Sequence, residues 1–357
     1  MNSPENPTRS SKAADTGPTP SRPERPLEVA VIGAGMSGLV CARLLAESGH
    51  HVRIFDKARG PGGRMATRRA GPLRFDHGAQ YFTVRDPCFR RWVESWEADG
   101  LATRWKGRLA VVRGGEIALK HDATERWVGV PGMNAICRRL ATGLDVNFGI
   151  RIVHLARSDG RWELGAHDGA DLGRFDAVVV SAPAPQTAAL LAASAPGLSA
   201  RAGHVEMDPC WAVMASYPLT LGLTFDGAFV EDAPLGWIAR NSAKPGRPSG
   251  EAWVLHASPE WSRKHLELDR EVAAQWLVEA FREAVGRDLP PPASLTAHRW
   301  RFALPVNPLA EPCLFDQELA VAACGDWAGG PRVEGAFLSG CAAAQRILEL
   351  RSTPKHL

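Results

Sequence analysis

The stretch that decides the fold is Gly33-Ala34-Gly35-Met36-Ser37-Gly38. It follows the apolar run 27–32 and opens an alanine- and leucine-rich segment that ends near Gly49. This order predicts a strand, a turn and a helix. The first glycine permits a tight turn, the second lets the backbone approach a pyrophosphate, and the third allows the helix to pack closely on the strand. The N–H groups at the start of the helix would then face the phosphates.

A second apolar run, 51–55, ends at Asp56. An acid at the end of the second strand, about 20 residues beyond the turn, can accept hydrogen bonds from both ribose hydroxyls of an adenosine. It would also disfavour a 2′-phosphate at that position. A glycine turn alone occurs in many folds, but the turn, helix, strand and acid together predict a Rossmann-type dinucleotide-binding domain.

The segment that follows Asp56 indicates which dinucleotide binds. It reads Lys57-Ala58-Arg59-Gly60-Pro61-Gly62-Gly63-Arg64-Met65-Ala66-Thr67-Arg68. Plain nicotinamide-binding domains lack this extension, whose glycines and arginines offer further backbone donors and cations to a diphosphate. The segment therefore favours a flavin. Alternatively, the arginines at 59, 64 and 68 could form a basic loop exposed to solvent, because runs of charged residues usually lie at the surface.

A second cofactor element is expected near the C-terminus. The apolar run 319–324 ends in Gly325-Asp326, and a glycine-rich loop leads to apolar residues at helical spacing from Val333. A helix N-terminus beside the pyrimidine side of an isoalloxazine would stabilise the negative charge that appears on reduction. Asp326 could instead be a turn or capping residue, because Gly-Asp pairs are common in turns.

These motifs resemble renalase and its bacterial homologues, within the larger flavin amine oxidase superfamily. The resemblance runs in family order from about residue 27 to 348. It is carried by Gly62-Gly63-Arg64-Met65 and by segments 76–83, 127–133, 182–186, 207–213, 297–300, 324–327 and 332–336.

The resemblance implies an FAD cofactor and a set of residues that hold it. The cysteines sit in no known attachment pattern, so we expect the FAD to be noncovalent. The family pattern places Val153 near the adenine. The predicted cofactor-binding residues are Gly33, Ala34, Gly35, Met36, Ser37, Gly38, Asp56, Lys57, Arg59, Gly63, Arg64, Met65, Val153, Gly325, Asp326, Arg332, Val333, Glu334 and Ala336.

Renalase-like enzymes oxidise the isomers of NAD(P)H that carry hydride at C2 or C6 of the nicotinamide. The resemblance thus implies hydride transfer to flavin N5, reoxidation by dioxygen to hydrogen peroxide, and a role in metabolite repair. No side-chain acid or base is required for a dihydropyridine donor, so no catalytic residue is assigned. The predicted partners are the small dihydronicotinamide and O2, with no protein partner.

The predicted fold class is α/β: a Rossmann-type FAD-binding domain, like those of glutathione reductase and the amine oxidases, with an inserted α+β substrate domain on an antiparallel sheet. Extended runs within 205–305, with one clear helix at 269–285, suggest that sheet, and 145–155 reads as a strand pair. We expect a disordered tail at 1–25, the FAD domain at 26–75, 131–200 and 306–357, and the substrate domain at 76–130 and 201–305.

Five side chains of the predicted substrate domain are candidates for substrate contact. Trp211 and Trp300 could stack on a planar heterocycle, although an interior tryptophan more often packs in the core. Gln80, His256 and Arg299 could read an amide or a sugar.

Composition excludes several other classes of protein. Basic and acidic side chains nearly balance, at 42 and 39, and no basic stripe suggests nucleic acid. Seven cysteines, an odd number, show no CxxC pair and no metal-ligand spacing, which suits a reducing cytoplasm. The first 25 residues are rich in proline, serine and charge and contain no stretch able to act as a signal or membrane span. We therefore expect a cytoplasmic protein without metal, nucleic acid or membrane.

Two alternatives stay open from the sequence. One is a flavin amine oxidase of a small amine, whose site would commonly carry a tyrosine-lined cage; only two tyrosines, Tyr81 and Tyr217, are present. The other is a non-catalytic binding protein on the same scaffold, as in the Rab escort and dissociation-inhibitor proteins. The intact glycine set and Asp56 argue against the second, and a yellow protein would remove it.

Overall fold

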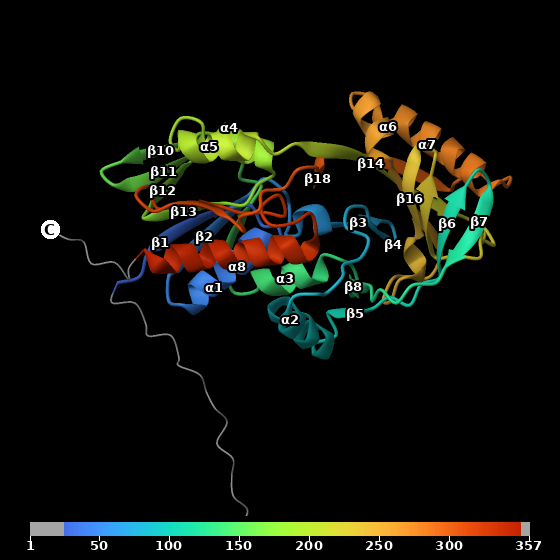
Figure 1. Ribbon diagram of the computed structural model, residues 1–357, viewed down its shortest axis with the longest axis horizontal. Helices are drawn as coiled ribbons and strands as arrows, with labels where there is room; N and C mark the ends of the chain where they lie inside the picture. The colour runs from blue at the N-terminus through green and yellow to red at the C-terminus, as the bar shows by residue number, and fades with distance from the viewer. Residues whose placement is uncertain (1–24, 351–357) are drawn as a thin grey trace, which may run out of the picture.

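The computed structural model describes residues 25–350 and shows two sheets side by side, each with its own helices (Figure 1). One part carries a six-stranded sheet with helices on both faces, and the other a seven-stranded sheet with helices on its outer face. The predicted disordered tail at 1–25 lies outside the described residues except for Arg25, as do the last seven residues of the predicted 306–357 segment.

The six-stranded sheet confirms the Rossmann-type α/β fold. Its strand order is β19-β20-β13-β1-β2-β9, and all neighbours are parallel except β19 and β20. The chain passes from β1 through helix α1 to the neighbouring parallel strand β2, as a βαβ unit requires. The strands are β1 (Glu28–Ile32), β2 (His51–Asp56), β9 (Asp145–Phe148), β13 (Ala177–Val180), β19 (Leu314–Asp316) and β20 (Val321–Ala323).

Two hydrophobic cores cover the faces of this sheet. Val29 and Val31 of β1 pack toward the helices on one face, whereas Ala30 and Ile32 pack toward the other, as strand alternation requires. Three helices cover the first face: α1 (Met36–Glu47), α3 (Ala135–Ala141) and α8 (Val333–Glu349). Two helices, α4 (Ala184–Leu191) and α5 (Pro196–Gly203), cover the second face. A small sheet of β10 (Ile152–Ser158), β11 (Arg161–Ala166) and β12 (Asp171–Phe175) also packs on the second face.

The seven-stranded sheet has the order β18-β14-β17-β16-β15-β6-β7 and is antiparallel except between β15 and β6. Helix α7 (Arg270–Val285) packs on its outer face and begins at Asp269, whose carboxylate accepts hydrogen bonds from the first-turn amides. The strands are β6 (Leu109–Arg113), β7 (Glu116–Lys120), β14 (Met207–Tyr217), β15 (Gly227–Glu231), β16 (Leu235–Arg240), β17 (Glu251–Ala257) and β18 (Ser294–Pro305).

Short elements connect the two sheets. The hairpin of β3 (Thr67–Ala70) and β4 (Leu73–Asp76) runs from the cofactor loop onto the inner face of the seven-stranded sheet. There Phe75 packs against Met214 and Val254. The remaining elements are η1 (Gly63–Met65), α2 (Pro87–Ala98), β5 (Ala102–Arg104), β8 (Trp127–Gly129), η2 (Asn241–Ala243) and α6 (Pro259–Lys264).

Two local expectations were wrong. Segment 145–155 is not a strand pair: β9 joins the large sheet and β10 a different one, because β9 aligns parallel to β2. A second helix, α6, begins after Ser258, whose hydroxyl caps it. The seven-stranded sheet itself is mainly antiparallel, as expected, with one parallel pair between β6 and β15. Within residues 25–350, no helix is both long and apolar enough to cross a membrane.

Candidate active site

The three glycines of the turn meet three different surroundings. Gly33 has a φ of +114°, and a Cβ there would overlap the carbonyl oxygen of Ser181. A Cβ on Gly38 would overlap the carbonyl oxygen of Gly33. Gly35 differs, because a Cβ on it would meet no atom within 4 Å. The first and third glycines are therefore required by packing, while the second faces open space at the start of α1.

This open space fits a pyrophosphate. Gly35 is the N-cap of α1, and no side chain caps the helix, so the first-turn N–H groups lack a side-chain acceptor there. An anion at this point would accept hydrogen bonds and interact favourably with the helix dipole. Ala34 and Met36 are buried in the turn, and Ser37 bonds the hydroxyl of Ser181 at 2.7 Å.

Asp56 lies at the end of β2, as predicted, and beside the glycine turn. Its carboxylate accepts hydrogen bonds from the backbone N–H groups of Ala34, at 2.6 Å, and Ala58, at 2.7 Å. Each carboxylate oxygen retains a lone pair for a ribose hydroxyl. The amide of Ile150 bonds the Asp56 carbonyl, which holds the following segment close, and there Val153 is 48% exposed. Val153 is thus an exposed apolar side chain three residues after this contact.

The loop after β2 reaches both the glycine turn and the C-terminal motif. A Cβ on Gly63 would lie 3.5 Å from the Cα of Gly35, so the two glycine-rich segments meet. Arg64 donates two hydrogen bonds to the carboxylate of Asp326, at 2.8 and 2.6 Å. The other predicted residues of this loop differ in position: Lys57 bonds the side chain of Gln186 at 3.3 Å, Arg59 is exposed, and Met65 is buried in the core.

The C-terminal motif is held tightly around Asp326, which is buried. The amide of Gly325 donates to the hydroxyl of Ser339, and a Cβ on Gly325 would lie 2.6 Å from the indole nitrogen of Trp327. Helix α8 begins at Val333, as expected; Val333 and Ala336 are half-buried and Arg332 is exposed.

Glu334, which was predicted to bind the cofactor, instead contacts backbone groups of the protein. Its carboxylate accepts hydrogen bonds from the amides of Arg85, at 2.7 Å, and Asp86, at 2.8 Å, just before α2. This contact ties α8 to the start of α2. It accounts for the buried Glu334 carboxylate without a cofactor.

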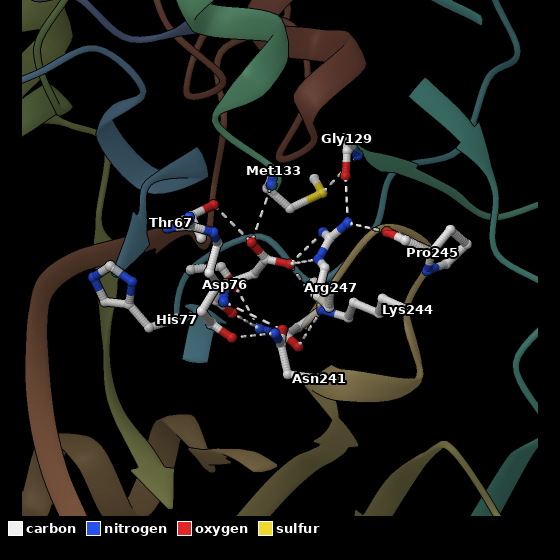
Figure 2. A network of polar contacts seen from close by, with 12 residues as sticks. Thr67, Asp76, His77, Gly129, Met133, Asn241, Lys244, Pro245 and Arg247 are labelled. Carbon is white, nitrogen blue, oxygen red and sulfur yellow. Dashed lines mark hydrogen bonds and ion pairs between the residues drawn. The ribbon is translucent and has the colours of Figure 1, made fainter. Parts of the chain in front are cut away.

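A buried ionic network lies at the end of β4 (Figure 2). Asp76 is fully buried and pairs with Arg247 at 2.5 Å and with Lys244 at 3.5 Å. The Thr67 hydroxyl and the Met133 amide also donate to it, at 2.7 and 3.0 Å. Burial alone would raise the pKa of Asp76, but Lys244, Arg247 and the Met133 amide hold it below its usual value. Asp76 is therefore a carboxylate that is already neutralised.

Lys244 links this network to Gln80. Its ammonium group, which is also buried, donates to Gln80 Oε1 at 3.0 Å. Burial lowers the pKa of Lys244 to about 8, against the opposing effect of Asp76. The Gln80 amide nitrogen donates to the carbonyls of Asp76 and Gly78. Because a lysine only donates, Lys244 fixes the orientation of the Gln80 amide.

Next to Gln80, two further predicted residues meet at one backbone carbonyl. The oxygen of His77 accepts from Trp300 Nε1 at 2.9 Å and lies 3.1 Å from His256 Nε2. A carbonyl only accepts, so this contact assigns the proton of His256 to Nε2. The His77 ring stacks on Trp300 with centroids 5.0 Å apart and lies 4.9 Å from the ring of His298. Gln80, His77, His256, His298 and Trp300 form what we call the histidine cluster.

The histidine cluster is neutral at physiological pH. Burial lowers the pKa of His77 to about 3, with further contributions from His298 and Arg68. Burial likewise lowers the pKa of His256 and of His298 to about 4. His77 Nδ1 is buried and has no hydrogen-bond partner within residues 25–350. The cluster thus offers polar but uncharged groups to a ligand.

Two hydrogen bonds of Arg64 bring the histidine cluster to the cofactor loop. The amide of Ala79 donates to the carbonyl of Arg64 at 2.8 Å, and the Arg64 guanidinium donates to the carbonyl of Ala303 at 2.9 Å. Ala79 precedes Gln80 in the sequence, and Ala303 lies on β18, three residues after Trp300. The histidine cluster therefore lies next to the cofactor loop.

Trp211 and Arg299 do not join this site, which corrects the sequence-based set. Trp211 is fully buried under α6 and α7, and its indole donates to the carbonyl of His265. The Arg299 guanidinium lies over the Trp211 ring and pairs with Glu267 at 2.8 Å. Side chains alternate along a strand, so these two residues point to the helix-covered face, whereas Trp300 points to the inner face.

Sequence reasoning missed His77, His298 and Lys244 as site residues. His77 lies within the motif 76–83. His298 precedes Trp300 by two residues on the same strand, so the sequence could have predicted that both side chains point to the same face. Lys244 had no such signal, because its partners come from distant segments. Among residues 25–350, no three or more histidine, cysteine, aspartate or glutamate side chains are grouped so that they could hold a metal ion.

Comparison with known protein families places the fold and this site in context. Residues 31–96 match the model of an NAD(P)-binding Rossmann-like domain, and residues 114–348 match that of flavin containing amine oxidoreductases. The chain belongs to the flavin-containing amine oxidoreductase family. Membership implies a flavin cofactor and oxidoreductase activity. The resemblance to renalase is finer than this family and stays a prediction.

Curated relatives match this family member only locally. A 4,4'-diapophytoene desaturase (4,4'-diaponeurosporene-forming) of Staphylococcus haemolyticus is 42% identical over 60 residues, and that of Staphylococcus aureus 44% identical over 60 residues. Each match covers 17% of this chain and only 12% of the relative. These matches support a shared segment rather than a shared activity.

Solved structures match over nearly the whole chain, at a sequence identity of 14% that shows the fold alone. A protein of Exiguobacterium sp. 255-15, provisionally named a protoporphyrinogen oxidase, has a TM-score of 0.73 and covers 90% of this chain and 99% of its own. An oxidoreductase of Methanosarcina mazei has a TM-score of 0.66 with 89% and 100% covered. A putrescine oxidase bound to putrescine has a TM-score of 0.67 with 91% and 99% covered.

Proposed function

We propose that this protein is an FAD-dependent oxidase of the 2- or 6-dihydro isomers of NAD(P)H. Oxidation of one isomer, with one proton and O2, gives NAD(P)+ and hydrogen peroxide, so two electrons pass from the dihydropyridine to dioxygen. Bound FAD would supply the hydride acceptor and the site of reoxidation. A role in the repair of misreduced cofactors follows from this reaction.

One observation carries the choice of substrate: the histidine cluster holds no free negative charge. Its nearby carboxylate, Asp76, is engaged by Lys244 and Arg247, and all three are buried. The three histidines have lowered pKa values and are neutral. A protonated amine would find cations and neutral donors here, which disfavours its binding. A neutral dihydropyridine with a carboxamide suits the same groups.

The residues of the cluster have separate roles in this proposal. Trp300 offers an aromatic face to the dihydropyridine, and the Nε2–H tautomer of His256 leaves Nδ1 as an acceptor for a carboxamide N–H. Gln80 is positioned by Lys244. The protein's contribution is to bind and orient the donor carbon, since no proton needs to be abstracted from it.

The residues of the cofactor site support a noncovalent FAD. The open space at Gly35 would admit a pyrophosphate, and Asp56, beside it, would accept hydrogen bonds from an adenosine ribose. Burial raises the pKa of Cys324, the residue before Gly325, to about 12. Its thiolate, the form that reacts, is therefore scarce at neutral pH, which disfavours a covalent link.

The test is anaerobic stopped-flow measurement of flavin bleaching in the purified protein. Rapid bleaching by a 2- or 6-dihydro isomer, with a slow response to 4-dihydro-NAD(P)H and to amines, is the expected result and names the isomer. Bleaching by amines alone would replace the proposal with an amine oxidase, the activity that the name of the putrescine oxidase neighbour carries. A colourless protein that binds no added FAD would reject both.

A further inference from the structure

A hollow of about 310 Å³ lies between the β3–β4 hairpin and helix α3, away from the histidine cluster. Four arginines and no carboxylate line it, and apolar side chains form part of its wall. We call it the arginine crevice, and its main lining residues are Arg69, Arg74, Arg138, Arg139, Leu101 and Ala135.

The charges in this crevice are not balanced by the protein. Arg69 and Arg74 occupy directly opposite positions on β3 and β4, an arrangement of like charges that destabilises a hairpin. Within residues 25–350, the side chains of Arg69, Arg74 and Arg138 have no hydrogen bond or ion pair. Arg139 has one exposed partner, Asp99, at 3.8 Å. Three guanidinium groups therefore line one hollow without a counter-ion, beside a fourth whose counter-ion is exposed.

The hairpin itself explains why no carboxylate neutralises them. Side chains alternate along the strands, so Arg69 and Arg74 share a face with Thr67 and Asp76. Asp76 is fully buried and already engaged by two cations, and it cannot also serve the crevice. The opposite face of the hairpin packs on the seven-stranded sheet through Phe75.

The crevice is distinct from the flavin and substrate sites. None of the predicted cofactor residues lines it, nor does any member of the histidine cluster. Its volume is at the lower end of the range for small-molecule sites. Arginine forks match the oxygens of a phosphate group and bind it bidentately, which a scattered basic surface does not.

We propose that the arginine crevice binds the phosphate group of a small phosphorylated metabolite, at a site separate from the flavin. The guanidinium groups of Arg69 and Arg74 hold the phosphate and relieve their mutual repulsion. Leu101 and Ala135 contact the organic part of the ligand. Binding would thereby stabilise the hairpin that carries Asp76 and Thr67 between the cofactor loop and the inner sheet.

The test is isothermal titration calorimetry of the flavin-loaded full chain with inorganic phosphate, AMP, or vesicles that contain phosphatidic acid. We expect saturable binding of phosphate and AMP, weakened about tenfold in the double variant Arg69→Gln, Arg74→Gln. Absence of saturable binding, or equal affinity in the double variant, would overturn the proposal. Binding of vesicles without binding of phosphate or AMP would replace the metabolite with a membrane surface.

A matched control removes the same charge elsewhere. Arg282→Gln, Arg287→Gln alters one arginine in the last turn of α7 and one just after the helix, and it should leave the phosphate affinity unchanged. An equal loss in this control would show general charge attraction and contradict the site. Thermal unfolding adds an independent measurement: phosphate should raise the Tm of the wild type and the control but not of the crevice variant. Without phosphate, the crevice variant should be at least as stable as the wild type, because its like-charge pair is gone.

Discussion

Arg64 and Asp326 are 262 residues apart in the sequence, yet they form a bidentate ion pair with nitrogen–oxygen distances of 2.8 and 2.6 Å. The pair joins the glycine loop after β2 to the loop before α8, and Asp326 is buried. Two parallel N–H···O bonds to a carboxylate are stronger than a single contact and restrict orientation. These two loops, each predicted to hold the cofactor, are therefore held together by their own side chains.

A double-mutant cycle on this pair measures its strength. Arg64→Gln, Asp326→Asn and the double variant should show a coupling free energy of about 1 kcal/mol or more in urea unfolding. The exposed pair Arg113 and Glu231 is the control, and its coupling should stay below about 0.5 kcal/mol. A coupling for Arg64 and Asp326 no larger than this would show that the pair does not hold the loops together.

Gly35→Val should remove flavin retention without unfolding the protein. Its side chain would enter space that is open in the chain itself but needed by the pyrophosphate. Gly38→Val should instead lower the stability, because a Cβ there overlaps the Gly33 carbonyl. Flavin content after gel filtration and thermal unfolding of the flavin-free protein separate the two effects. Full flavin occupancy in Gly35→Val would refute the placement of the pyrophosphate.

Asp76→Asn should destabilise the protein by about 3–5 kcal/mol, because it leaves Lys244 and Arg247 buried without a counter-charge. The free energy of unfolding in urea measures this loss. Glu231→Gln breaks an exposed ion pair as the control and should cost less than about 1 kcal/mol. Similar losses in both variants would mean that the network at Asp76 is hydrated in solution.

The histidine cluster should make the protein less stable in acid. The unfolded state binds protons at histidine near pH 6.5, whereas the folded pKa values are about 3 for His77 and about 4 for His256 and His298. The free energy of unfolding should thus fall as the pH drops from about 6.5 to about 4, with no contribution above about pH 7. His256→Gln should reduce this slope, while His167→Gln, at an exposed site, serves as the control. A slope unchanged by His256→Gln would contradict the buried neutral state.

Trp300 and Arg299 are neighbours in sequence that should differ in function. Trp300→Phe keeps an aromatic ring but loses the donor to the His77 carbonyl, so the KM for a dihydronicotinamide should rise about threefold to tenfold. Arg299→Gln, on the helix-covered face, should leave kcat and KM unchanged. Steady-state oxidation rates of the two variants, measured against the concentration of the dihydronicotinamide, test which residue contacts the substrate. A larger effect from Arg299→Gln would reverse the assignment of the two faces.

The sequence determined the cofactor domain because the requirements there are local. Gly33 needs a positive φ, Gly38 must let α1 approach its own turn, and Asp56 ends the next strand; each signal lies within one βαβ unit. The helix from Val333 followed from its apolar spacing in the same way. Such features depend on backbone geometry over a few residues, so residue type and spacing were sufficient.

Only the tertiary structure decided which side chains form the substrate site. Alternation along β14 and β18 predicts two faces but not which one α6 and α7 cover, and this choice separates Trp300 from Trp211 and Arg299. Lys244 meets Gln80 across 164 residues, and its buried charge is tolerated because Asp76 lies beside it. The stability of a buried charge depends on partners brought together by packing, and local spacing carries no information about them.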